Sequence, residues 1–115
     1  MEFPSEYDFL EEFGMEPVEV DPGLALCRYI KKSESNQLEV DVSFSAVMRS
    51  FQIILRISEH ELVNVSSENV RLIKLVRDGS EAGMHVLFDV GDTVSEAKII
   101  LEPEISCRWW ILQNT

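Results

Sequence analysis

The stretch "QLEVDVSFS", residues 37–45, alternates apolar and polar side chains without a break. Its even-numbered positions from Leu38 to Phe44 are apolar, and the odd-numbered positions between them are acidic or hydroxylic. Successive side chains of a β-strand point to opposite faces. This period of two therefore predicts a strand with one face in the core and the other in solvent.

The chain on both sides of this stretch continues with further strands. "LALCRYIKK" (24–32) precedes it across the turn "SESN", and "SFQIILRIS" (50–58) follows it. Shorter strands are expected at "ELVNV", "VRLIKLVR", "MHVLFDV", "EAKIIL" and "ISCRWWIL", separated by polar turns. This spacing predicts an antiparallel meander, as a sandwich or a strongly curved sheet. Residues 69–77 also suit a short helix, but their β-branched side chains favour a strand.

Residues 5–14 predict one helix before the sheet. Ser5 and Asp8 resemble a capping box, and Gly14 supplies a C-terminal stop. At 100° per residue one half of the helix is apolar, and we expect this half to dock on the sheet. The apolar half carries Tyr7, Phe9, Leu10 and Phe13, and the opposite half carries Asp8, Glu11 and Glu12.

We therefore predict a mainly β fold of the α+β class, in which an N-terminal helix is followed by about seven or eight antiparallel strands. A single domain is expected over residues 1–115, because this length is ordinary for one domain with one core. Within it we expect a helix over 5–14, an extended connection over 15–23 and an antiparallel β body over 24–112.

Charge is the most informative property of the composition. The chain has 21 acids and 10 bases, a net charge of −11, and its first 22 residues contain eight of the acids and no base. This charge disfavours nucleic acid and anionic membranes as partners and favours a basic protein surface. The alternative explanation is that the acids only keep the protein soluble.

Two sets of residues are candidates for binding a basic partner. The first set is the carboxylates of the helix and the connection, and the second lies near the end of the last strand. The candidates are Asp8, Glu11, Glu12, Glu16, Glu19, Asp21, Arg108 and Trp110. In a strand, Trp109 and Trp110 point to opposite faces, and Trp109 is expected in the core. We expect the helix to cover Trp110 through Phe9 or Phe13. The alternative is that Trp110 is an exposed anchor for the partner.

Residues suited to catalysis or metal binding are sparse. Cys27, His60, His85 and Cys107 are separated by 33, 25 and 22 positions, which matches no compact zinc motif. The chain has no nucleophile elbow and no glycine-rich phosphate loop. We therefore expect no catalytic residue, no metal and no cofactor. The two cysteines are expected to be reduced and structural, with one long-range disulfide as the alternative.

The expected location is the cytoplasm. The start "MEFPSE" has neither the basic nor the apolar region of a secretory signal. No apolar run exceeds four residues, so a membrane span is not expected either.

A small, strongly acidic, β-rich chain without a ligand motif resembles the immunity proteins of bacterial polymorphic-toxin and contact-dependent inhibition systems. The resemblance covers the whole chain in size, charge and architecture. It implies that the protein neutralises a cognate toxin, often a basic nuclease, by stoichiometric binding and without catalysis. Secretion chaperones for effector proteins are a second acidic class, but they usually close with a helix, whereas this chain ends on "ISCRWWILQNT". The composition is also compatible with a small enzyme that has an unrecognised site, or with a housekeeping domain whose acidic surface is merely solvated.

Overall fold

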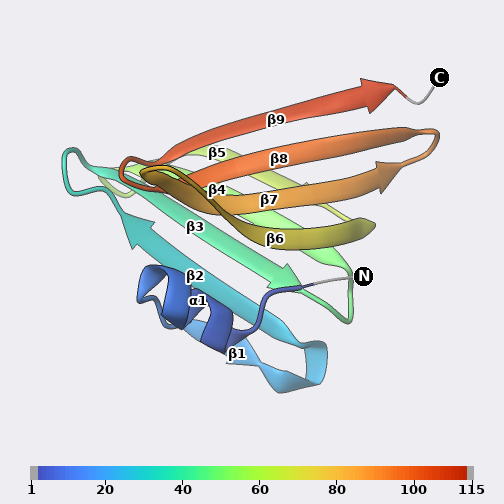
Figure 1. Cartoon of the computed structure of the whole chain (residues 1–115), viewed down its shortest axis with the longest axis horizontal. Coiled ribbons are helices and arrows are strands. Elements are labelled where there is room, and N and C mark those ends of the chain that lie inside the picture. The colour runs from blue at the N-terminus through green and yellow to red at the C-terminus, as the bar shows by residue number, and fades with distance from the viewer. Residues whose placement is uncertain (1–2, 114–115) are drawn as a thin grey trace.

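The computed structural model describes the backbone of residues 3–113 and the side chains of residues 3–110. Within these residues the chain forms one α-helix, one short 3₁₀ helix and nine strands (Figure 1). The elements are α1 (Glu6–Phe13), β1 (Glu19–Asp21), η1 (Pro22–Leu24), β2 (Leu26–Lys32), β3 (Leu38–Ser45), β4 (Ser50–Ile57), β5 (His60–Ser67), β6 (Val70–Asp78), β7 (Glu81–Val90), β8 (Thr93–Glu102) and β9 (Ser106–Gln113). No helix in this part of the chain is long and apolar enough to cross a membrane.

The strands form two antiparallel sheets, ordered β1-β2-β3-β4-β5 and β6-β7-β8-β9. Every neighbour in a sheet is also the neighbour in sequence, so each sheet is a meander. Figure 1 shows the second sheet lying across the first, with α1 beside β2 at the margin of the sandwich. The predicted mainly β fold is confirmed, and the ambiguous segment 69–77 is the strand β6. The strand beyond the expected eight is β1, which lies in the segment predicted as an extended connection.

The alternation in residues 37–45 has the expected effect. Val40, Val42 and Phe44 of β3 are buried against the other sheet. Val42 lies opposite Tyr29 of β2 and Ile53 of β4, so three neighbouring strands contribute buried side chains to the same face. This apolar face is the half of the core that the first sheet supplies.

Aromatic rings fill the core at two places. The ring of Phe9 stacks on that of Tyr29 with centroids 3.9 Å apart, which fixes α1 to the inner face of β2. On the second sheet, Trp109 stacks on Phe88 at 4.9 Å, and its indole N–H donates a hydrogen bond of 2.7 Å to Ser95 Oγ. The prediction that Trp109 packs in the core is thus confirmed.

The helix begins and ends where the sequence predicts. The backbone N–H of Asp8 donates to Ser5 Oγ at 3.1 Å, and the N–H of Ser5 donates to Asp8 Oδ2 at 2.8 Å, which completes a capping box. Hydrogen bonding of the Asp8 carboxylate with the backbone N–H of Ser5, and then with its side chain, lowers the pKa of Asp8. Gly14 adopts a left-handed conformation with φ of 66°, and its N–H donates to the carbonyl of Leu10 at 2.8 Å.

The predicted apolar half of the helix is only partly buried. Phe9 is fully buried and Phe13 packs against the core, but Tyr7 is 68% exposed and Leu10 is 47% exposed. The prediction was therefore wrong for Tyr7 and Leu10. The helix lies at the margin of the sandwich, so only one flank of it meets the core, and the rest of the apolar half faces outward.

The expectation that α1 covers Trp110 was also wrong. Phe9 and Phe13 pack against one another at 5.8 Å, and Phe9 stacks on Tyr29 in the first sheet. Trp110 lies opposite Glu96 of β8 on the outer face of the second sheet, where its side chain is exposed. The helix occupies the inner face of the other sheet and does not reach it. The alternative of an exposed Trp110 therefore describes the structure.

The polar face of β3 holds a buried ion network. The Asp41 side chain is only 3% exposed because two arginines cover it. Arg28 donates to both of its carboxylate oxygens at 2.9 and 2.8 Å, and Arg56 donates to Oδ2 at 2.8 Å. Burial alone would raise the pKa of Asp41, but the hydrogen bonds from the two arginines lower it below its ordinary value.

This lowered pKa predicts a loss of stability in acid. A carboxyl whose pKa is lower in the folded chain stabilises the fold above its ordinary pKa, and this contribution is lost as pH falls through the folded pKa. We expect the free energy of unfolding, measured by urea titration, to fall below about pH 4. The unfolding free energy of Asp41→Asn should fall less in acid than that of the wild type. The control Asp92→Asn, which changes an exposed aspartate, should fall as much as the wild type. Identical acid sensitivity of both variants would contradict this role of Asp41.

Candidate functional site

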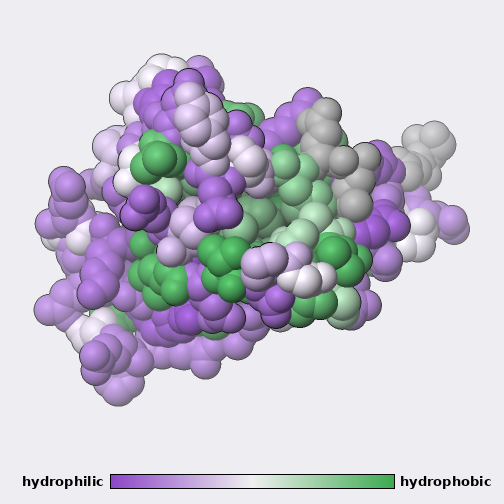
Figure 2. Space-filling view, turned by 90° about the horizontal axis from the view of Figure 1, so that it is seen from below, coloured by the Kyte–Doolittle hydropathy of each residue, from purple (hydrophilic) through white to green (hydrophobic). Residues whose placement is uncertain are grey.

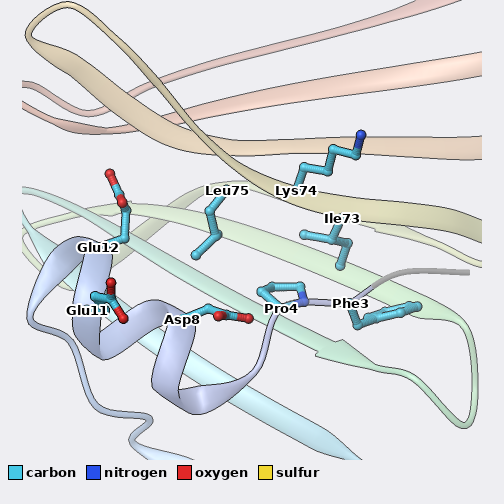
Figure 3. A pocket seen from close by; sticks show the side chains of 8 residues that line it. All are labelled: Phe3, Pro4, Asp8, Glu11, Glu12, Ile73, Lys74 and Leu75. Atoms are coloured by element: carbon cyan, nitrogen blue, oxygen red, sulfur yellow. The ribbon is translucent and has the colours of Figure 1, made fainter.

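A hollow separates α1 from β6 and has a volume of about 480 Å³. Acidic side chains of the helix form one wall, and residues of β6 and of the N-terminal segment form the others. The lining residues are Phe3, Pro4, Asp8, Glu11, Glu12, Ile73, Lys74 and Leu75 (Figure 3). Figure 3 shows Ile73 and Leu75 pointing from β6 toward the helix, whereas Lys74 points away from it. The hollow therefore combines an apolar floor with a wall of carboxylates.

An ion network ties the acidic wall to the second sheet. Arg77 of β6 donates from Nε to Glu12 Oε1 at 2.6 Å and from Nη2 to Glu102 Oε1 at 3.0 Å. The same Nη2 lies 3.4 Å from the carbonyl oxygen of Glu12, near the end of the helix. The hydrogen bonds that Arg77 donates to Glu12 and Glu102 raise its pKa. This contact holds the helix in a fixed position relative to β6.

The acids of the connection also have local partners. Asp21 Oδ1 accepts the N–H of Gly23 at 3.0 Å and caps η1. Glu19 Oε1 lies 3.4 Å from Nη1 of Arg28, beside the Asp41 network. In contrast, Glu11 and Glu16 are exposed, and their carboxylates make no hydrogen bond or ion pair with another described residue. Both carboxylates, like that of the exposed Glu6, are therefore available for an external cation.

The structure brings only part of the predicted site together. Asp8, Glu11 and Glu12 share the wall of the hollow, while Glu16, Glu19 and Asp21 follow along the edge of the first sheet. Arg108 and Trp110 lie on the outer face of β9 in the other sheet. Trp110 lines a separate hollow of about 300 Å³ together with His85, Glu96 and Lys98. The two sets are therefore distinct surfaces.

Arg77 and the two valines of the connection, Val18 and Val20, were not among the site residues predicted from the sequence. Arg77 is 65 positions from Glu12, and no local pattern joins them. Val18 and Val20 did leave a signal, because "EPVEVD" alternates acids and valines with a period of two. That pattern predicts a strand with both valines on one face. The strand β1 contains Val20, and Val18 lies just before it.

The two cysteines are free and partly buried. Burial raises the pKa of the Cys107 thiol, and burial followed by the nearby Glu6 carboxylate raises the pKa of Cys27. A raised pKa keeps a thiol protonated and weakly nucleophilic at neutral pH. Among the described residues, His, Cys, Asp and Glu form no group of three or more that is arranged to hold a metal ion.

Comparison with solved structures identifies a known protein with the same fold. No protein-family model matches the chain, and no curated protein matches it. Among solved structures, it is similar to a chain of the "Contact-dependent growth inhibition toxin - immunity protein complex from Klebsiella pneumoniae 342". The TM-score is 0.88, the sequence identity is 23%, and the match covers 96% of each chain. The two chains share one fold. The resemblance to contact-dependent inhibition proteins, which the sequence indicated, is thus confirmed at the level of the fold.

Proposed function

We propose that this chain is an immunity protein that neutralises a toxin in the cytoplasm by stoichiometric binding. The observation that carries the proposal is the fold shared with a chain of a toxin–immunity protein complex over 96% of both chains. Such a complex has two components, a toxin and its inhibitor. The negative net charge of this chain favours the inhibitor. A toxin with a net charge of −11 would be repelled by nucleic acid or by an anionic membrane.

The partner in this proposal is a basic protein surface that faces the N-terminal acids. Phe9 and Arg77 hold α1 in place, so the carboxylates of the helix have fixed positions before the partner arrives. Such preorganisation reduces the ordering entropy that binding costs. The available Glu11 and Glu16 would attract the partner at long range and increase the association rate.

The hollow beside α1 suits a long basic side chain from the partner. The aliphatic part of a lysine or arginine would lie on Ile73 and Leu75, and its charged end would reach the carboxylate of Glu11. Hydrogen bonds between a guanidinium or ammonium group and a carboxylate are about twice as strong as neutral ones. A basic residue of the toxin that is held in this way would be unavailable for its own substrate.

Co-expression tests the proposal directly. The probe is the protein encoded by the gene immediately upstream of this chain in its native host, expressed in a laboratory strain with and without the chain. We expect growth arrest by the probe alone and normal growth with both. With purified proteins, inhibition should be complete at one molar equivalent. Absence of rescue, or complete inhibition at a small fraction of an equivalent, would contradict stoichiometric neutralisation.

A further inference from the structure

Exposed apolar side chains gather on one side of the molecule. Of the twelve large apolar residues that are exposed in the described chain, seven belong to α1, the segment 15–21, η1 and the β3–β4 turn. We call these seven the apolar strip: Tyr7, Leu10, Val18, Val20, Leu24, Val47 and Met48. Figure 2 views the underside, where α1 and β1 lie in Figure 1, and shows apolar residues across its middle with hydrophilic residues around them. Singly scattered apolar residues need no explanation, but a gathered set is typical of an interaction surface.

Val20 of the strip and the exposed flank of α1 lie on the same side of the first sheet. Val20 is opposite Cys27, and Cys27 is opposite Phe44 of the core, so Val20 lies on the inner face of the sheet. Val18 lies just before β1 and is joined to β2 by a hydrogen bond from its N–H to the carbonyl of Arg28. At 100° per residue, Leu10 and Tyr7 lie on the flank of α1 away from Asp8 and Glu12, which face β6. Val20 and the exposed flank of α1 thus place this part of the strip at the β1 edge of the first sheet.

Backbone hydrogen bonds make the strip a fixed surface. The N–H of Val18 donates to the carbonyl of Arg28 at 2.8 Å, which extends the pairing of β1 with β2. The carbonyl of Leu24 accepts the N–H of Val47 at 3.4 Å and the hydroxyl of Ser45 at 2.6 Å. The β3–β4 turn is therefore joined to η1, and the apolar side chains are presented on an ordered backbone.

Exposed carboxylates are numerous along the N-terminal part of the strip. The exposed acids are Glu6, Glu11, Glu16, Glu19 and Asp21, and the first 22 residues contain no base. An apolar centre with a charged rim is the usual anatomy of a protein–protein interface. A second copy of this chain on the strip would bring two acidic rims together, and like charges at an interface cost free energy. Charge complementarity instead requires a partner with lysine and arginine around an apolar centre.

We infer that the apolar strip is the surface on which the basic partner docks, with its valines and Leu10 covered in the complex. This inference rests on the proposed function and adds the contact surface to it. The acids of the rim then set the orientation and speed of the encounter, and the apolar centre supplies most of the binding free energy.

The test compares two matched pairs of substitutions. Val18→Ser/Val20→Ser changes residues that are 56% and 44% exposed at the β1 edge. Leu62→Ser/Val63→Ser changes residues that are 58% and 41% exposed on β5, at the opposite edge of the same sheet. Titration calorimetry with the purified upstream-encoded protein should show a Kd about tenfold weaker for the first pair, or about 1.4 kcal/mol. The second pair should bind like the wild type.

Each contrary outcome overturns a defined part of the proposal. Equal affinities for both pairs, or weakening by the β5 pair alone, would overturn the strip as the docking surface while the immunity function stands. Sedimentation that shows a wild-type dimer lost in Val18→Ser/Val20→Ser would assign the strip to contact between copies and overturn the inference. Failure of the wild-type chain to bind the upstream-encoded protein would overturn the proposed function and the inference together.

Discussion

The Phe9→Ala variant is expected to lose about 3–5 kcal/mol of unfolding free energy, the usual cost of removing a buried phenylalanine ring. Phe9 is fully buried and its ring lies 3.9 Å from that of Tyr29 and 5.9 Å from that of Phe44. Its removal leaves a cavity between α1 and the first sheet. Eight helical residues are too few to remain folded without this contact, because isolated short helices are marginal in water.

Urea denaturation followed by fluorescence and far-UV circular dichroism measures the effect. The matched control is Tyr7→Ala, which removes another aromatic ring from the same helix. Because Tyr7 is 68% exposed, its substitution should change the unfolding free energy by less than about 0.5 kcal/mol. Similar losses in the two variants would show that Phe9 does not anchor the helix.

Amide hydrogen exchange extends this test from stability to local structure. In Phe9→Ala we expect residues 6–13 to exchange faster than the strands, because the helix can open without unfolding the sheets. A helix that stays as protected as β3 would contradict the anchoring role. The same variant should also bind the proposed partner more slowly, since its carboxylates would no longer be held in place.

The strands were predictable because their signals are local. A period of two in residues 37–45 fixes which side chains of β3 enter the core, whatever lies around them. The capping box of Ser5 with Asp8 and the stop at Gly14 are also local, and both ends of α1 agree with them. Segment 69–77 was ambiguous only because its apolar residues suit two periods, and its β-branched content decided correctly.

The positions that failed depend on contacts between distant segments. Tyr7 and Leu10 are as apolar as a docking helix requires, but their burial is decided by where α1 meets the sandwich. Trp110 was assigned to the helix because an amphipathic helix needs an apolar surface, and Tyr29 supplies that surface instead. The bond from Arg77 to Glu12 joins residues 65 positions apart, so neither partner reveals the other in the sequence.

Charge reversal of the available acids should slow association with the proposed partner. Glu11→Lys/Glu16→Lys changes two exposed carboxylates of the N-terminal segment that make no hydrogen bond or ion pair with another described residue, and the net charge goes from −11 to −7. At low salt we expect the association rate to fall at least about tenfold, because electrostatic steering accounts for that much in comparable complexes. Stopped-flow fluorescence over a range of salt concentrations measures this rate.

The matched control separates local steering from total charge. Glu34→Lys/Glu68→Lys gives the same net charge of −7 by changing exposed acids in the β2–β3 and β5–β6 turns. We expect this variant to associate faster than Glu11→Lys/Glu16→Lys at low salt. The difference should vanish near 1 M salt, where the Debye length is only about 3 Å. Equal slowing of both variants would mean that only total charge matters, so the acids serve solubility. If neither variant associates more slowly, the N-terminal segment does not steer the encounter. The surface to test next is then the outer face of β9. It holds Arg108 and Trp110, the remaining exposed side chains that were predicted to bind the partner.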